Sequence, residues 1–193
     1  MLCGECFTYL LAMDIIRYLS IFIDINRSCN RNNKVEKRPY GNSGVELSVV
    51  GFGGILVTDT DPIEASSLVS KAIDSGVNYF DVAPSYGNAE ECLGPAIESY
   101  RKKVFLACKT AERSSAGAEK ELVRSLKRMR SEYFDLYQLH AMIKMEEIDR
   151  VVAPDGALSY LVKAREKGLI KYIGFSAHSV EVALKLLDIF DFD

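Results

Sequence analysis

Four side chains with complementary acid–base chemistry follow three successive apolar stretches of this sequence: Asp81, Tyr86, Lys109 and His140. A phenol is a weak acid at neutral pH, but an ammonium beside it stabilises the phenolate left behind. A carboxylate can hold that ammonium in place, and an imidazole can donate a hydrogen bond to the same substrate oxygen. This set suits protonation of a carbonyl oxygen while a hydride reaches its carbon. No protein side chain donates hydride, so the chemistry requires a separate cofactor.

Each of the four residues also has a simpler interpretation. Asp81 could cap a turn, Tyr86 could pack on the surface, Lys109 could be solvated and His140 could be a hydrogen-bonded core histidine. Their joint placement at successive strand ends favours a site. A glycosidase with two carboxylates is disfavoured, because no second strand-end acid accompanies Asp81. Among the neighbouring residues, Cys108 is expected to point into the core and His178 to lie in a loop.

The elements that must position these residues alternate regularly from residue 45 onward. Near-continuous apolar runs are typical of strands with both faces covered, and each run here precedes a segment with helical spacing. The strands are expected at 47–55, 77–83, 103–110, 133–141 and 169–177, and the helices at 61–76, 88–100, 116–131, 154–168 and 179–192. Ser179 is a plausible N-cap, and Gly168 lies just past a helix end. The class is α/β with a parallel sheet.

Such a sheet fits two architectures, an open doubly wound sheet and a closed (β/α)8 barrel. The dinucleotide fingerprint G-x-G-x-x-G is incomplete after the first strand, because Leu56 occupies the third glycine position. In a barrel the carboxyl ends of the strands converge on one mouth, which is where active sites of this fold are built. Asp81, Lys109, His140 and Ser176 would then meet there.

The amino-acid composition of the chain disfavours several classes of function. The chain has 193 residues, 48% of them hydrophobic, and a formal net charge of -3, which fits one globular core and disfavours nucleic-acid binding. The basic stretch 124–130 has helical spacing and predicts a solvated helix face. Five cysteines, an odd number, make no disulfide framework and indicate a reducing, cytoplasmic compartment. The Cys3/Cys6 pair lacks the partners of a redox or zinc site, so no metal is expected.

Residues 1–36 are expected to form an extension outside the core, which would span 37–193. The apolar run 6–25 is interrupted by Asp14, Arg17 and Asp24, which disfavours a membrane span, and it lacks the pattern of a secretory signal. A membrane-surface helix and an incorrectly assigned start codon both remain open for this segment.

Over residues 38–193 the sequence resembles the aldo-keto reductase family. The resemblance rests on GVNYFDVAPSYGNAEE (76–91), VFLACKT (104–110), RSLKRMRSEYFDLYQLH (124–140) and GALSYLVKAREKGLIKYIGFSAHS (156–179). It implies a (β/α)8 barrel that interconverts carbonyls and alcohols with NADP(H), or sometimes NAD(H). The family's catalytic tetrad then corresponds to Asp81, Tyr86, Lys109 and His140, with Tyr86 as the general acid. The resemblance also implies cofactor contacts at Gly53, Gly54, Ile55 and Ser176.

The sequence departs from this family in two places. Ala177 stands where the family commonly has an asparagine that helps to hold the nicotinamide carboxamide. The sequence also ends in the fifth helix, so the expected barrel is incomplete, with about five strand–helix units, as in a fragment. An open sheet edge would need an oligomer or a partner to cover it. The alternative to a carbonyl reductase is therefore a catalytically inactive relative that acts as an interaction module.

Overall fold

The computed structural model describes residues 34–193, and a parallel sheet of five strands lies at its centre. The strands pair in sequence order and are β3 (Phe52–Gly53), β4 (Tyr79–Asp81), β5 (Phe105–Thr110), β6 (Phe134–Met142) and β7 (Ile170–Ala177). The expected α/β class with a parallel sheet is confirmed.

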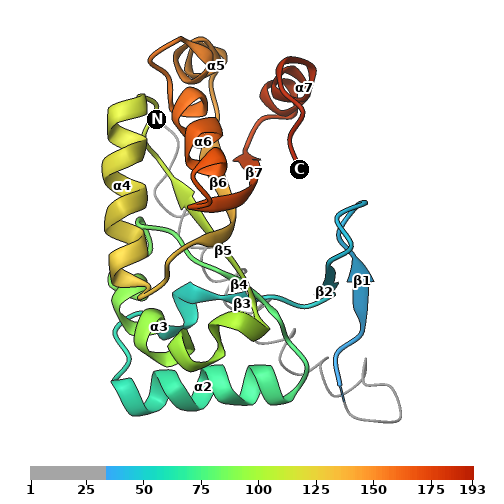
Figure 1. The fold of residues 1–193 in the computed structure, drawn as a ribbon, viewed down its shortest axis with the longest axis vertical. Coiled ribbons are helices and arrows are strands. Elements are labelled where there is room, and N and C mark those ends of the chain that lie inside the picture. The colour runs from blue at the N-terminus through green and yellow to red at the C-terminus, as the bar shows by residue number, and fades with distance from the viewer. Residues whose placement is uncertain (1–33) are drawn as a thin grey trace, which may run out of the picture.

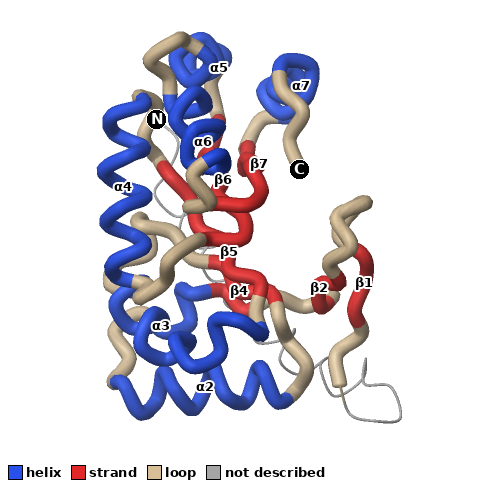
Figure 2. The backbone as a smooth tube through the Cα atoms, in the orientation of Figure 1, coloured by secondary structure: helices blue, strands red, loops and turns tan. Residues whose placement is uncertain are grey.

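A helix follows each strand, and each helix except the last returns the chain to the start of the next strand. These α-helices are α2 (Pro62–Asp74), α3 (Ala89–Ile97), α4 (Ser115–Arg128), α6 (Ala157–Glu166) and α7 (Val180–Ile189), with 3-10 turns at η1 (Gly54–Val57) and η2 (Glu98–Lys103). Helices α2, α3, α4 and α6 line one side of the curved sheet (Figure 1). Figure 2 shows the strands bent around the other, open side.

Local signals in the sequence explain where these helices begin and end. The Asp61 carboxylate accepts hydrogen bonds from the amides of Ile63 and Glu64 at 2.8 and 2.9 Å, which caps α2. Ser179 caps α7 through a 3.3 Å bond from the Val182 amide, as predicted. Gly168 follows α6 with φ of 73°, a left-handed conformation that glycine adopts without strain.

The main core lies between the sheet and the helices. Alternate strand residues such as Phe80, Leu106 and Ile173 are fully buried there against helix residues such as Leu93 and Leu122. Burial of a side chain of this size stabilises the fold by roughly 1.5–3 kcal/mol. The core thus fixes which strand faces turn outward to the helices and which turn inward.

A short antiparallel hairpin covers part of the inner face. Its strands are β1 (Lys37–Pro39) and β2 (Glu46–Ser48), and the aromatic and aliphatic residues of the hairpin pack on the sheet. The prediction that one strand spans 47–55 is wrong at both ends, because Leu47 and Ser48 pair with β1 and Gly54 and Ile55 belong to η1. A second correction is α5 (Met145–Val152), a helix in a stretch where none was predicted.

The expectations for residues 1–33 concern residues outside the described part of the chain, including the apolar run and Cys3/Cys6. Val35 belongs to the described core, where it is buried and its amide donates to the Ser75 carbonyl at 2.8 Å. Within residues 34–193 no helix is both long and apolar enough to cross a membrane.

Candidate active site

Four of the predicted site residues lie on the inner face of adjacent strands, near the carboxyl ends. Side chains alternate along a strand, so Asp81 shares a face with Tyr79, and Lys109 shares one with Phe105. His140 and Ser176 occupy the equivalent face of β6 and β7. The parallel register brings Asp81 opposite Ala107 and Lys109 opposite Gln138, which places these polar side chains on neighbouring strands.

Lys109 forms the centre of the site. Its ammonium donates to Asp81 Oδ1, lies 3.4 Å from the Val82 carbonyl oxygen and lies 3.3 Å from the Tyr86 hydroxyl. Only 7% of the Lys109 side chain is exposed, against 23% for Asp81. A buried ammonium needs an anionic partner, and Asp81 supplies it at the strand end.

The loop after β4 turns Tyr86 back over this ion pair. The Tyr86 amide donates to the Ala83 carbonyl at 3.0 Å, and Gly87 follows with φ of 60°. Thr58 donates to the Tyr86 carbonyl at 3.3 Å. As a result the phenol ring lies beside the ammonium, with Lys109 Nζ 5.0 Å from its centroid.

His140 completes the group from β6. Its ring centroid lies 6.0 Å from that of Tyr86 in an edge-to-face arrangement, and its Nδ1 lies 3.5 Å from Ser85 Oγ. Burial, followed by the positive charge of Lys109, lowers the pKa of His140 from its ordinary value. The imidazole is therefore neutral near pH 7 and can donate one hydrogen bond without bringing a second cation to the site.

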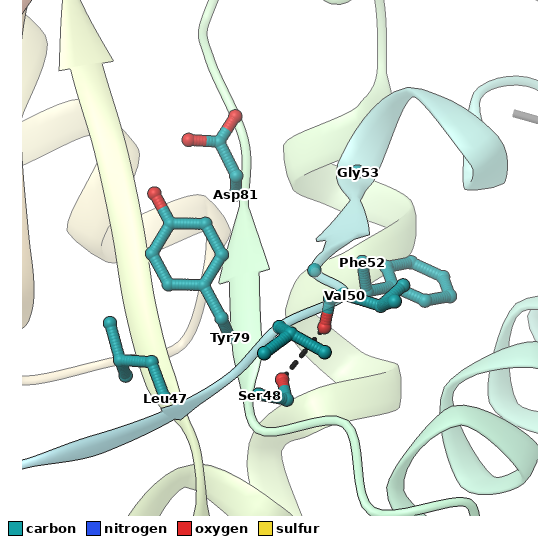
Figure 3. A pocket seen from close by; sticks show the side chains of 9 residues that line it. Leu47, Ser48, Val50, Phe52, Gly53, Tyr79 and Asp81 are labelled. Carbon is teal, nitrogen blue, oxygen red and sulfur yellow. Dashed lines mark hydrogen bonds between the residues drawn. The ribbon is translucent and has the colours of Figure 1, made fainter. Parts of the chain in front are cut away.

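A cavity of about 560 Å³ opens beside Asp81, between β4 and the segment that leads from β2 into β3. Tyr79 lies below Asp81 along β4, and its hydroxyl points toward the Asp81 carboxylate (Figure 3). Burial, followed by the charge of Asp81, raises the pKa of Tyr79. The sequence did not single out Tyr79, because nothing in its position distinguishes it from a core tyrosine.

The predicted cofactor contacts fall in different surroundings. Gly53 lines the cavity next to Asp81, and Ile55 is exposed. Gly54 is buried against β4, where a Cβ atom would come within 2.9 Å of Val82, so strand packing alone explains this glycine. Ser176 Oγ accepts a 2.9 Å hydrogen bond from the Ala141 amide.

Two other expectations can be placed in the structure. Cys108 is fully buried in the outer core and points away from the Lys109 side, as predicted. His178 lies exposed in the loop after β7. Among residues 34–193 no cluster of three or more histidine, cysteine or acidic side chains could hold a metal ion.

Comparison with known proteins gives a consistent result. The family model of the aldo/keto reductase family matches residues 49–191. The uncharacterized oxidoreductase YqkF of Bacillus subtilis strain 168 is 34% identical over 157 residues, which cover 74% of this chain and 49% of that protein. The aldo-keto reductase YhdN of the same organism is 31% identical, with 76% and 48% covered. The chain thus spans about half the length of these curated relatives.

Solved structures of similar proteins have the same fold as this chain. An aldo-keto reductase of Bacillus halodurans in its holo form superposes with a TM-score of 0.71 at 27% identity, covering 82% of this chain and 55% of that one. An aldo/keto reductase of Brucella melitensis gives 0.64 at 28% identity, with 81% and 59% covered. The five strand–helix units are therefore part of an incomplete barrel of this type. The match over residues 49–191 places the chain in the aldo/keto reductase family of oxidoreductases.

Proposed function

We propose that this chain carries the acid–base half of an NADP(H)-dependent reductase that converts an aldehyde or ketone to an alcohol. The observation that supports this most directly is the contact between Lys109 Nζ and the Tyr86 hydroxyl at 3.3 Å, with Asp81 on the other side of the ammonium. A cation beside a phenol stabilises the phenolate that forms when the phenol gives up its proton. Tyr86 is the proposed general acid.

The other residues have distinct proposed roles. Asp81 orients the Lys109 ammonium and balances its charge in a buried setting. His140, neutral near pH 7, donates a hydrogen bond to the carbonyl oxygen and helps to orient the substrate. The nicotinamide cofactor supplies the hydride when it is bound. Catalytic inactivity, the alternative in which the chain is an interaction module, has no support from the two named relatives, an oxidoreductase and an aldo-keto reductase.

The described residues fit the nicotinamide end of such a cofactor. Ser176 accepts from the Ala141 amide and keeps its own hydroxyl proton, so it can donate to a carboxamide oxygen. Gly53 presents no side chain at the cavity beside Asp81. The proposal also includes an N-terminal extension followed by a core, with the boundary before the predicted 36/37 because Val35 is buried in the core. It further includes a cytoplasmic location and a partner or second copy along the free sheet edge.

Replacement of Tyr86 by Phe tests this function. Removal of a general acid typically costs 10²–10⁴-fold in rate, so Tyr86→Phe should lower kcat for carbonyl reduction by at least about 100-fold. The assay is oxidation of NADPH, and of NADH for comparison, with a panel of aldehydes and ketones. Tyr100→Phe, in η2 and away from the site, is the matched control and should keep wild-type turnover. Turnover near the wild-type rate in Tyr86→Phe would exclude Tyr86 as the acid.

Fluorescence titration of NADPH against the full chain tests the cofactor separately. Saturable binding supports the proposal even before a substrate is found. A folded chain that binds neither NADPH nor NADH would contradict it.

A further inference from the structure

The end of β6 departs from regular strand geometry next to His140. The pairing of β6 with β7 shifts register between Leu139 and Met142. Between these residues, Ala141 has φ of 53°, in the left-handed region that residues other than glycine rarely adopt. Such a conformation costs free energy and persists only where its surroundings hold it. The bulge sets the backbone from which the His140 side chain projects.

Hydrogen bonds from two other segments hold this bulge. The Ala141 amide donates to Ser176 Oγ at 2.9 Å. On the other side, the Arg113 guanidinium donates from Nη2 to the His140 carbonyl at 2.8 Å and to the Ala141 carbonyl at 3.3 Å. Arg113 thus contacts the carbonyl oxygens on both sides of the left-handed Ala141 Cα.

Arg113 is itself fixed by partners on either side. Its Nε and Nη2 donate to Glu147 Oε1 at 3.0 and 2.9 Å, and its Nη1 donates to the Ala111 carbonyl at 3.1 Å. The other oxygen of Glu147 accepts from the amides of Ile143 and Lys144 at 2.8 and 2.9 Å, at the start of α5. Only 18% of the Arg113 side chain is exposed. The rigid fork of donors therefore joins the loop after β5, the end of β6 and α5.

We propose that Arg113, anchored by Glu147, is a positioning residue that holds the His140 imidazole against Tyr86. It acts through the His140 and Ala141 carbonyls and contacts no reacting atom. The catalytic consequence rests on the proposed function, whereas the orientation of His140 does not. Lysine cannot replace arginine here, because a single ammonium cannot span the two carbonyls and the carboxylate with a planar fork.

The His140 ring is a suitable reporter because the sequence contains only two histidines, His140 and His178. In the full chain labelled with 13C-histidine, His178→Gln assigns both ring signals. Nuclear Overhauser contacts between the His140 and Tyr86 rings then measure their proximity, and a pH titration measures the ionisation of His140. Charged or titratable groups around His140 come from β4, the loops and β5, and they are Asp81, Tyr86, Lys109, Arg113 and His178.

Arg113→Lys keeps the positive charge and removes the fork. We expect the His140–Tyr86 contacts to weaken at least about twofold, and the Ala141 amide to exchange about tenfold faster, because local opening of the bulge becomes easier. Arg150→Lys is the matched control. Arg150, in the last turn of α5, forms a similar fork to Asp155 on the exposed surface, at 2.8 and 3.1 Å, and its replacement should leave the His140 signals unchanged.

A folded Arg113→Lys variant with wild-type His140–Tyr86 contacts and wild-type Ala141 exchange would overturn the proposal. If that variant does not fold, Glu147→Gln weakens the anchor without touching Arg113 and should change the same signals in the same direction. The wild-type chain provides a third measure. Its Arg113 Nε proton should exchange more slowly than that of Arg150, and equal exchange would also overturn the proposal.

Kinetics separate this inference from the proposed function. In an active chain, Arg113→Lys should lower kcat by on the order of 10- to 100-fold, since misplacement of a group by about 1 Å can cost this much. KM for NADPH should change less than kcat, because Arg113 reaches the proposed cofactor contact Ser176 only through the Ala141 peptide. A purely structural clamp for α5 would leave kcat unchanged. If the wild-type chain reduces no carbonyl, that result counts against the proposed function. The role of Arg113 is then decided by the nuclear magnetic resonance measurements alone.

Discussion

Lys109 shows how burial makes one side chain depend on another. Its ammonium is almost fully enclosed, whereas the Asp81 carboxylate keeps access to water. Removal of the carboxylate leaves a buried cation without its counter-charge, but removal of the ammonium leaves a carboxylate that water can still reach. The two halves of this ion pair therefore differ in what their loss costs.

Asp81→Asn should destabilise the fold by about 3 kcal/mol, the usual cost of stranding a buried charge. Lys109→Met should cost about 1 kcal/mol or less, because an apolar side chain of similar volume fills the same space. Urea unfolding of both variants gives the two free energies of unfolding. Equal losses, or a larger loss for Lys109→Met, would show that the ammonium is better hydrated than its burial indicates.

His140 should make stability depend on pH. Its pKa is lowered in the folded chain, so between that pKa and the ordinary value of about 6.5 the unfolded chain binds more protons. The free energy of unfolding should therefore fall as pH drops from about 7.5 to about 5.5. His140→Gln should flatten this dependence, and His178→Gln, in the exposed loop, should not. Unfolding curves at both pH values measure the difference, and an unchanged slope in His140→Gln would contradict the assignment.

The sequence predicts the placement of the main site residues better than it predicts the residues that hold them in position. Parallel strands bring their carboxyl ends together, so Asp81, Lys109 and His140 could be placed near one another from the alternating pattern alone. Arg113 carries no such signal, because its contacts depend on the path of the loop after β5 and on a bulge that the apolar pattern does not encode. Gly54 was predicted as a cofactor contact, yet close packing on β4 is sufficient to explain it.

At the scale of elements, α3 and α4 cross at very short range. Gly94 of α3 lies against the end of α4, where a Cβ atom would come within 2.2 Å of the Arg128 carbonyl oxygen and 2.8 Å of Met129 Cα. Both neighbours are backbone atoms, which cannot move aside as a flexible side chain can. The crossing therefore requires the absence of a side chain at this position.

Gly94→Ala should destabilise the fold by about 2–3 kcal/mol, as expected when a close-packed crossing is forced apart. Gly168→Ala is a useful comparison, because Gly168 has open space around its Cα and only the left-handed φ of 73° opposes the change. We expect a cost of about 1 kcal/mol there. Thermal unfolding of the two variants compares crowding with backbone strain; a smaller effect at Gly94 would mean that α4 can shift freely.

The elements that the sequence did not predict are those whose stability comes from contacts with other segments rather than from a repeating apolar face. The hairpin strands β1 and β2 have three residues each, too few to show a hydrophobic period. Helix α5 has eight residues, and it begins where Glu147 accepts two backbone amides and the Arg113 guanidinium. The five main helices and strands β5, β6 and β7 were predictable because each has an apolar face long enough to repeat. Strands β3 and β4, with two and three residues, were predicted from the longer apolar runs that contain them.

At the scale of the molecule, α7 leaves an apolar stripe exposed. Val180, Leu184 and Leu187 recur at helical spacing and are 78%, 60% and 58% exposed, while Val182 and Leu186 of the same helix are buried. At the free edge of β7, the Asp193 amide donates to the Ile173 carbonyl at 3.0 Å, and the Asp193 carboxylate accepts from the Ile173 amide at 2.9 Å. Exposed apolar surface of this kind promotes association.

We expect the protein to associate as its concentration rises. A double variant with Leu184→Glu and Leu187→Lys should associate less. The two new charges lie three residues apart on the helix, so they can pair and preserve its stability. Sedimentation velocity over a range of concentrations measures the effect. Val123→Glu, at an isolated exposed apolar position on α4, is the control and should behave as the unmodified chain does. Equal association in all three would place the contact elsewhere.

The aromatic layer under the hairpin has an optical consequence. Tyr40 meets Phe105 and Tyr172 edge to face at 5.5 and 5.4 Å, and Phe105 stacks on Tyr79 and Tyr172 at 5.8 and 5.9 Å. The chain contains no tryptophan, so tyrosines dominate its near-ultraviolet circular dichroism. Rings held in a fixed, asymmetric arrangement give a signal that vanishes once they rotate freely. Loss of only part of the tyrosine band at constant helical ellipticity would therefore report that the hairpin has left the sheet while the rest of the fold, including the buried Tyr137, persists.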